Sequence, residues 1–213
     1  PLLILGSGGH AAVLVDILRQ NNRKIAGIVS PEVSQERIFS GIKSYLKDDD
    51  VLSFDIKNIQ LVNGVGSLPG CSIRAKLHEK FLEASYQFES VISEHAIVSP
   101  YATIGQGVQV MPGAIIQAGA NIGDNTIINT GAIIEHDCQI GLNNHIAPGV
   151  TLSGCVNTGE YVHIGTGASV IQSVTIGDRA IVSAGACVKK DMEKNNIAFG
   201  YRTITKIIEG LRP

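Results

Sequence analysis

The chain has 213 residues, 44% hydrophobic and 17% charged, so it can bury a sizeable core and is neither disordered nor fibrous. Seventeen basic against nineteen acidic residues leave a net charge of −2, which excludes the basic field that nucleic acid or an anionic membrane requires. Four scattered cysteines without a Cys-x-x-Cys pair predict neither a metal site nor a redox motif, and suit a reduced cytoplasm. The apolar run at 1–5 is too short for a membrane span or a signal peptide.

The first ninety residues alternate between apolar and amphipathic segments. We expect strands at 2–5, 24–29, 42–46 and 59–63, and helices at 11–20, near 50 and at 72–86. Strands alternating with helices predict a small parallel α/β domain, which we assign to residues 1–90.

A glycine-rich loop joins the first strand to the first helix. It consists of Gly6, Ser7, Gly8, Gly9 and His10. Free backbone N–H groups at the start of a helix favour a phosphate, although a glycine turn could serve strand-to-helix packing alone. The acidic residue expected about twenty positions later is at best Glu32, and the domain is short for a dinucleotide fold. A mononucleotide or nucleotide-sugar is therefore the predicted ligand.

A repeat of six residues fills the rest of the chain. At every sixth position from Ile92 to Val188, sixteen of seventeen residues are aliphatic, and small residues follow four positions after each. The period fits neither an α-helix nor a simple alternating strand, so each hexad must be one short strand and one corner. The repeat predicts a β-solenoid over residues 91–213, with the segment after Val188 as its C-terminal cap.

Two histidines stand out within the repeat. His136 lies between Glu135 and Asp137, and a carboxylate bonded to one ring nitrogen raises the basicity of the other, as a general base requires. The alternative is a solvated polar corner. His145 follows Asn144, the one large polar residue in the small-residue series, and such breaks are expected at functional sites.

The hexad pattern resembles that of the hexapeptide-repeat acyltransferases, which coil as a left-handed parallel β-helix with eighteen residues per turn. Together with the glycine loop, the Ile-Glu-His-Asp motif and a histidine nine residues later, the layout resembles the sialic-acid O-acetyltransferase and bacterial UDP-4-amino-sugar N-acetyltransferase family. The resemblance implies a Rossmann-like N-terminal domain followed by this β-helix, and a homotrimer with active sites between neighbouring solenoids.

The resemblance also implies roles for individual residues. His136 would be the general base with Glu135 as its partner, Asn129 and His145 would line the pocket, and acetyl-CoA would lie along the solenoid without a metal. The glycine loop with His10 would hold UDP. In eighteen-residue coils His163 stacks on His145 about 4.8 Å away, and Gly154 forms an open shelf above His136 for the pantetheine arm. Further CoA contacts are expected at Gly165, Thr166 and Ala184.

The leading hypothesis is transfer of acetyl from acetyl-CoA to the 4-amino group of a UDP-linked amino-dideoxy sugar in bacterial surface-glycan synthesis. Where the family carries an acidic pair for the nucleobase, this chain has Ser30-Pro31-Glu32. O-acetylation of a sialic acid or another sugar is the close alternative, with Arg74 as the nearby candidate for a carboxylate clamp. A zinc-dependent carbonic anhydrase is a third hypothesis, which would require a pair of histidines five residues apart. This chain has no such pair. A non-catalytic trimeric scaffold would bind UDP but not acetyl-CoA.

Overall fold

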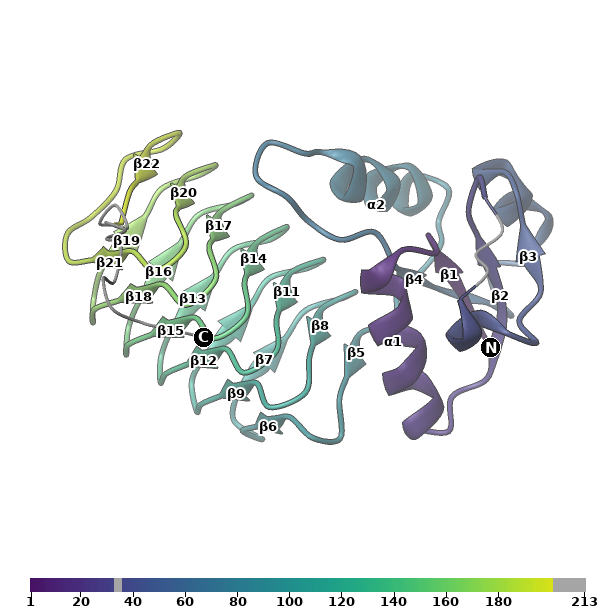
Figure 1. Cartoon of the computed structure of the whole chain (residues 1–213), viewed down its shortest axis with the longest axis horizontal. Helices are drawn as coiled ribbons and strands as arrows, with labels where there is room; N and C mark the ends of the chain where they lie inside the picture. Colours follow the sequence, from purple (N-terminus) through teal and green to yellow (C-terminus); the bar gives the residue numbers. More distant parts are fainter. Residues whose placement is uncertain (33–35, 201–213) are drawn as a thin grey trace, which may run out of the picture.

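The structure is a computed structural model that describes residues 1–32 and 36–200. Its N-terminal part is built on a parallel sheet in the order β3-β2-β1-β4 (Figure 1). The strands are β1 (Leu2–Leu5), β2 (Ile25–Val29), β3 (Ser44–Tyr45) and β4 (Gln60–Asn63), and the helices are α1 (Gly9–Gln20), α2 (Ile73–Glu83) and the 3-10 helices η1 (Arg37–Phe39) and η2 (Asp48–Ser53). All of β1 is buried, as expected for a central strand of a parallel sheet. The predicted α/β elements are confirmed, except that the helix near residue 50 is the 3-10 helix η2.

The repeat folds into a parallel solenoid with three flat faces. Face 1 consists of β5 (Val91–Ile92), β8 (Gln109–Val110), β11 (Ile127–Ile128), β14 (His145–Ile146), β17 (His163–Ile164), β20 (Ile181–Val182) and β22 (Ile197–Ala198). Face 2 consists of β6 (Ile97–Val98), β9 (Ile115–Ile116), β12 (Ile133–Ile134), β15 (Thr151–Leu152), β18 (Ser169–Val170) and β21 (Cys187–Val188). Face 3 consists of β7 (Thr103–Ile104), β10 (Asn121–Ile122), β13 (Gln139–Ile140), β16 (Asn157–Thr158) and β19 (Thr175–Ile176).

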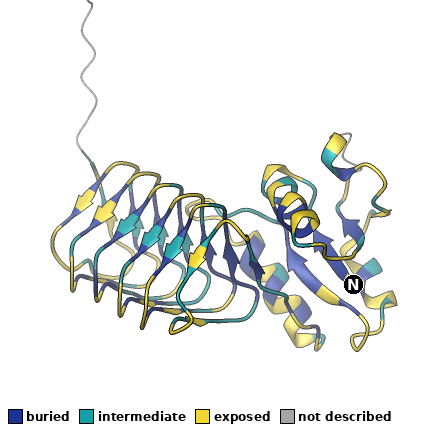
Figure 2. Ribbon diagram, turned by 90° about the horizontal axis from the view of Figure 1, so that it is seen from below, coloured by how far each residue is buried: buried dark blue, intermediate teal, exposed yellow. Residues whose placement is uncertain are grey.

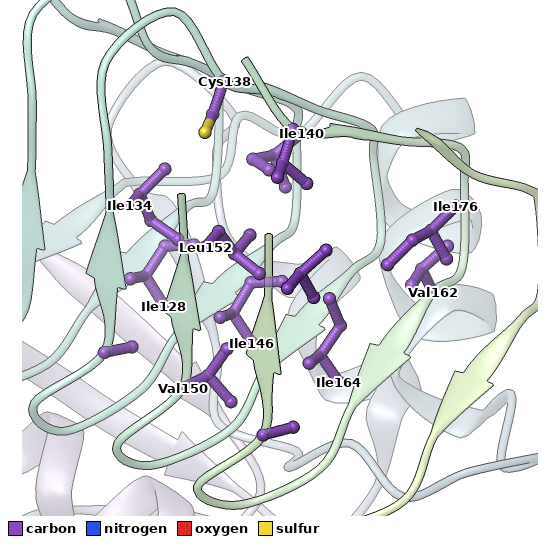
Figure 3. Close-up of a cluster of buried hydrophobic side chains, with 14 of the residues drawn as sticks. Ile128, Ile134, Cys138, Ile140, Ile146, Val150, Leu152, Val162, Ile164 and Ile176 are labelled. Carbon is purple, nitrogen blue, oxygen red and sulfur yellow. The ribbon is translucent and has the colours of Figure 1, made fainter. Parts of the chain in front are cut away.

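The hexad pattern sets the direction of each side chain. Paired strands align residues eighteen positions apart, for example Ile128 with Ile146, so equivalent residues stack in columns. The second residue of most strands points inward and is buried, which gives a continuous aliphatic core (Figure 3). Burial alternates accordingly around each coil (Figure 2). Every sixth residue from Gly107 to Gly185 has a left-handed φ, which makes each corner, and half of these residues are not glycine.

The two departures from the repeat bond to each other inside the solenoid. Asn144, the polar member of the small-residue series, donates from Nδ2 to Oγ1 of Thr158 at 2.6 Å and to the carbonyl of Gly159 at 2.9 Å. Thr158 is the one non-aliphatic member of the inward series. Asn144 also accepts the N–H of Val162 at 2.6 Å, so both buried groups are satisfied. The interpretation of Asn144 as the mark of a functional site is therefore wrong: it is a core residue.

The N-terminal part packs on face 1 of the solenoid. Helix α1 shares an apolar cluster with Val91, Met111 and Ile127, which come from the first coils. Helix α2 lies alongside the coils on the other side of the sheet (Figure 1). The Arg74 guanidinium ties α2 to the solenoid through the Asn125 carbonyl, with both Nε and Nη2 at 3.3 Å. Loops at the carboxyl ends of β1 and β4 consequently meet face 1.

Within residues 1–32 and 36–200, no helix is long and apolar enough to cross a membrane. The C-terminal cap expected after Val188 lies partly outside the described residues, which end at Gly200.

Candidate active site

His136 stands at the corner between faces 2 and 3, two residues after the end of β12. The imidazole is exposed, and its Nδ1 lies 2.9 Å from Oδ2 of Asp137. An ionised carboxylate can only accept, so Nδ1 carries the proton in this hydrogen bond, and in the neutral imidazole Nε2 is the nitrogen with the lone pair. An imidazole oriented in this way can take a proton from a nucleophile. The carboxylate that orients His136 belongs to Asp137, whereas the sequence-based expectation had assigned this partnership to Glu135.

Two glycines, one in the coil before and one in the coil after, make room for the side chains of His136 and Asp137. A Cβ on Gly154 would lie 2.5 Å from Nε2 and 2.6 Å from Cε1 of His136, so the imidazole occupies the space above Gly154. A Cβ on Gly119, in the preceding coil, would overlap the carboxylate of Asp137. The expectation of an open shelf at Gly154 is therefore wrong, because the histidine ring fills it.

The same corner gathers side chains of metal-ligand type. Ligand atoms of His136, Asp137 and Cys155 lie within 4.8 Å of one another, and all three residues are exposed. A cation bound there would compete with the hydrogen bond that orients the imidazole.

His10 lies at the junction between the N-terminal part and face 1. Its Nε2 is 2.7 Å from Oε1 of Gln109, whose Nε2 donates to the carbonyl of Asn63 at 2.7 Å. Because that donation fixes the orientation of the Gln109 amide, Oε1 must accept, and Nε2 of His10 carries the proton. The His10 ring is thus directed to the solenoid. Burial, with Arg74 contributing, lowers the pKa of His10 to about 4, so it offers a phosphate no positive charge at neutral pH.

His145 and His163 occupy successive coils of face 1, as the repeat predicts, and their rings meet edge to face with centroids 4.9 Å apart. Asn129 Oδ1 accepts the N–H of Thr130 at 2.8 Å, so its Nδ2 faces Nε2 of His145 at 3.0 Å and donates to it. Burial, then the neighbouring His163 and His10, lower the pKa of His145 to about 3. Burial also lowers the pKa of His163. The predicted pair of Asn129 and His145 therefore forms one hydrogen-bonded unit with a neutral imidazole.

The glycine loop offers free space on one side. A Cβ on Gly8 or Gly9 would meet nothing within 4 Å, whereas Gly6, with φ +103, packs against Gly64. Ser7 Oγ donates to Oγ of Ser30 at 2.8 Å. The loop at Gly8 and Gly9 therefore has both uncovered backbone and the start of α1, which suits a phosphate.

The predicted site residues divide between two corners of the solenoid. His136 and Gly154 lie between faces 2 and 3, whereas Thr166 and Ala184 lie exposed between faces 1 and 2. Gly165 is buried at the second corner, and a Cβ there would lie 2.6 Å from the backbone nitrogen of Ala184. Close packing between coils accounts for this glycine. One chain alone therefore does not bring His136 and the group around His145 to one corner.

Sequence reasoning missed Gln109, Asn63 and the orienting role of Asp137. Gln109 is an outward residue of β8 and fully buried under the N-terminal part. In the sequence Gln109 has the same pattern as a solvent-facing residue. Its burial becomes visible only when the N-terminal part is docked on the solenoid. Asp137 stood beside His136 in the motif, but the choice between two flanking carboxylates depends on the corner geometry.

Residues 119–154 match the family model of bacterial transferase hexapeptide repeats, and residues 1–81 match the PglD N-terminal domain. A histidine-to-asparagine mutant of perosamine N-acetyltransferase from Caulobacter crescentus, in complex with CoA and GDP-perosamine, is 33% identical with a TM-score of 0.83, and 93% of each chain is covered. The chain belongs to this family of hexapeptide-repeat sugar acetyltransferases. It is accordingly an acyltransferase, and its solenoid is the left-handed parallel β-helix of that family.

A second solved structure supports the family membership. The acetyltransferase domain of PglB from Neisseria gonorrhoeae FA1090, in complex with acetyl coenzyme A, is 29% identical over 92% of this chain and 94% of that one, with a TM-score of 0.84. WeeI from Acinetobacter baumannii AYE, 22% identical over 92% of this chain and 94% of that one with a TM-score of 0.80, shares the fold. A search of curated proteins gave no match.

Proposed function

We propose that this sugar acetyltransferase moves the acetyl group of acetyl-CoA to the 4-amino group of a UDP-linked amino-dideoxy sugar in bacterial surface-glycan synthesis. The observation that carries the proposal is the exposed His136, whose Nδ1 is held by Asp137 and whose Nε2 is left with a lone pair. The related perosamine enzyme binds CoA together with a nucleotide-linked sugar, which supports both substrate classes.

The chemistry needs one proton acceptor. As the amine nitrogen attacks the thioester carbonyl, Nε2 of His136 takes a proton from that nitrogen, and Asp137 stabilises the resulting imidazolium. The C–N bond forms, the C–S bond breaks, and the CoA sulfur leaves as the thiolate and takes up a proton. Direct attack by a held amine gains its rate from orientation and from donors around the carbonyl oxygen.

We propose that the complete site lies between two copies of the chain in a homotrimer. The two groups of site residues lie at different corners, so a neighbouring solenoid would have to bring His136 to the His145 group of its partner. The first three coils of face 2 offer a contact surface, because their outward residues Ile97, Ile115 and Ile133 are apolar, whereas the same column continues with Thr151, Ser169 and Cys187. Face 3 instead presents the polar outward residues Thr103, Asn121, Gln139, Asn157 and Thr175.

We propose the glycine loop as the nucleotide site, supported by the uncovered backbone at Gly8 and Gly9. A UDP-linked sugar is the first acceptor to test. A GDP-linked sugar is the second, since the perosamine enzyme binds one.

Arg74 is not free to bind the carboxylate of a sialic acid, as the O-acetyltransferase alternative would require. Arg74 is 5% exposed, and its Nη1 donates to the carbonyls of Asn63 at 2.8 Å and Val65 at 2.7 Å, while Asn125 accepts from the other nitrogens. The guanidinium is thus committed to backbone carbonyls, and a carboxylate clamp would require it to release them.

The test is mass spectrometry of the sugar after incubation with acetyl-CoA and UDP-2-acetamido-4-amino-2,4,6-trideoxyglucose, and in parallel with GDP-perosamine. An acetyl increment supports the proposal, and the acceptor that gains it identifies the nucleotide. Acetylation of sialic acid alone would replace the proposed acceptor. No product, and no binding of acetyl-CoA, would favour the scaffold.

A further inference from the structure

A pocket of about 220 Å³ lies between the N-terminal part and the solenoid. One wall is the loop from Ser67 to Ser72 with the first turn of α2, and the other is formed by face 1 and the adjoining corner with face 3, including Tyr161 and Arg179. The glycine loop does not line it. The volume suits one part of a nucleotide-sized ligand better than the whole of it.

The pocket is lined by two arginines, and the nearest carboxylate that the structure ties to its lining, that of Glu79, is bonded to the Tyr161 hydroxyl at the rim. Arg74 and Arg179 both line it, and none of the described lining residues is an aspartate or glutamate. Arg74 has no ion-pair partner within residues 1–32 and 36–200, since its hydrogen bonds all end on carbonyls. A buried guanidinium without a counterion favours an anion nearby, and burial lowers the pKa of Arg74 to about 9.

The second arginine is held at the rim by an aromatic ring. The guanidinium carbon of Arg179 lies 5.0 Å from the centroid of Tyr161, and Tyr161 Oη donates to Oε1 of Glu79 on α2 at 3.0 Å. The ring is thereby fixed between α2 and the solenoid, and the exposed arginine stacks on it. This arrangement holds a bidentate donor at the pocket entrance with little conformational entropy to lose.

The start of α2 adds backbone donors on the opposite wall. Its N-cap, Ser72, makes no side-chain cap hydrogen bond, and its first turn contains no acidic residue. The first N–H groups of a helix without a cap are available to an anion. Leu68, Pro69 and Ile181 supply an apolar surface beside these donors.

We propose that this pocket binds a phosphate group of one of the two nucleotide substrates, with Arg179 as the contacting cation and the start of α2 as the opposite donor. The inference rests on the proposed function for its two possible sources, a phosphate of the nucleotide-sugar that the glycine loop does not hold and the phosphates of coenzyme A. Both present the same chemistry, a doubly substituted or terminal phosphate attached to a partly apolar body.

The test measures direct binding of UDP, GDP and CoA by isothermal titration to the full chain. Leu68 is 71% exposed, so Leu68→Glu adds a negative charge at the pocket without disturbing the core, and Leu68→Gln is its uncharged isostere. Arg179→Gln removes the cation, and Lys57→Gln removes one positive charge at an exposed position away from the pocket. We expect Leu68→Glu and Arg179→Gln to weaken one nucleotide class by about tenfold, and the two controls to stay within about twofold.

Weaker binding of UDP or GDP assigns the pocket to the acceptor, and weaker binding of CoA assigns it to the donor. Unchanged affinities for all three nucleotides in both variants, or no binding of any of them to the wild-type chain, would overturn the proposal. These measurements do not depend on acetyl transfer. If the protein acetylates an amino sugar but binds all nucleotides independently of Arg179, the proposed function stands and this inference fails. If nucleotide binding depends on Arg179 but no amino sugar is acetylated, this inference stands and the proposed function fails.

Discussion

Replacing Gly154 with alanine tests the placement of the proposed base by adding a single methyl group. The added Cβ would lie 2.5 Å from Nε2 of His136, whereas ordinary contact begins at 3.4 Å. The imidazole must therefore move by about 3.4 − 2.5 = 0.9 Å, and it is free to do so because its side chain is 61% exposed. The backbone at Gly154 is not in the left-handed region, so the coil itself accepts alanine.

A displacement of about 1 Å in a catalytic group can reduce the rate about a hundredfold. We expect Gly154→Ala to lower kcat by about this factor, with a small change in the KM for either substrate and a Tm within a few degrees of the wild type. The assay is steady-state acetyl transfer followed by mass spectrometry, with thermal unfolding of the same samples. Gly200→Ala is the matched control, because its added Cβ would meet neighbours at 3.4 Å, which is ordinary contact.

The reasoning would be refuted if Gly154→Ala kept kcat within about twofold of the wild type while His136→Ala was inactive. Such a result would show that catalysis does not depend on the ring position seen over Gly154. A large loss of Tm would instead show that the methyl group strains the coil, and kcat would then be measured well below the Tm of the variant, where the chain is folded.

Four further predictions follow from the site. Asp137→Asn should lower kcat by about a hundredfold and Glu135→Gln by only a few-fold, because the hydrogen bond to Nδ1 comes from Asp137; the opposite order would restore Glu135 as the partner. Inactive His136→Ala and His145→Ala chains, unfolded and refolded together in equal amounts, should regain activity at about one site in four if each site takes one residue from each copy, and no recovery would contradict a shared site. Urea unfolding at fixed protein concentration should show stability falling as the pH drops from 7 to 5, since burial holds the pKa of His10 at about 4 and of His145 at about 3 while the unfolded imidazoles protonate near 6.5. Each histidine that stays neutral contributes at most about 2 kcal/mol over this range, the loss should be smaller in His145→Asn, and a flat profile would contradict the burial. Arg74→Lys should destabilise the chain by about 3 kcal/mol, as chemical denaturation would measure, because an ammonium cannot reach the carbonyls of Asn63, Val65 and Asn125 together; a change below about 1 kcal/mol would show that the guanidinium is dispensable.

The sequence determines the solenoid because its signal is local and periodic. An aliphatic residue at every sixth position fixes which side chain of each short strand points inward, and no distant contact is needed to establish that pattern. His136 and His145 could be singled out for the same reason, since a strict repeat makes each departure visible. The same logic failed at Asn144, because a departure can also be satisfied within the core, as its bond to Thr158 shows.

Only the tertiary structure decided which groups meet. The choice of Asp137 over Glu135 depends on a left-handed corner, and the loss of the shelf at Gly154 depends on the stacking of two coils. The interdomain network around Gln109, and the pocket beside Arg179, join residues far apart in the sequence. Such contacts carry no periodic signal, because they arise when two independently patterned parts dock and bury polar groups that must then find partners.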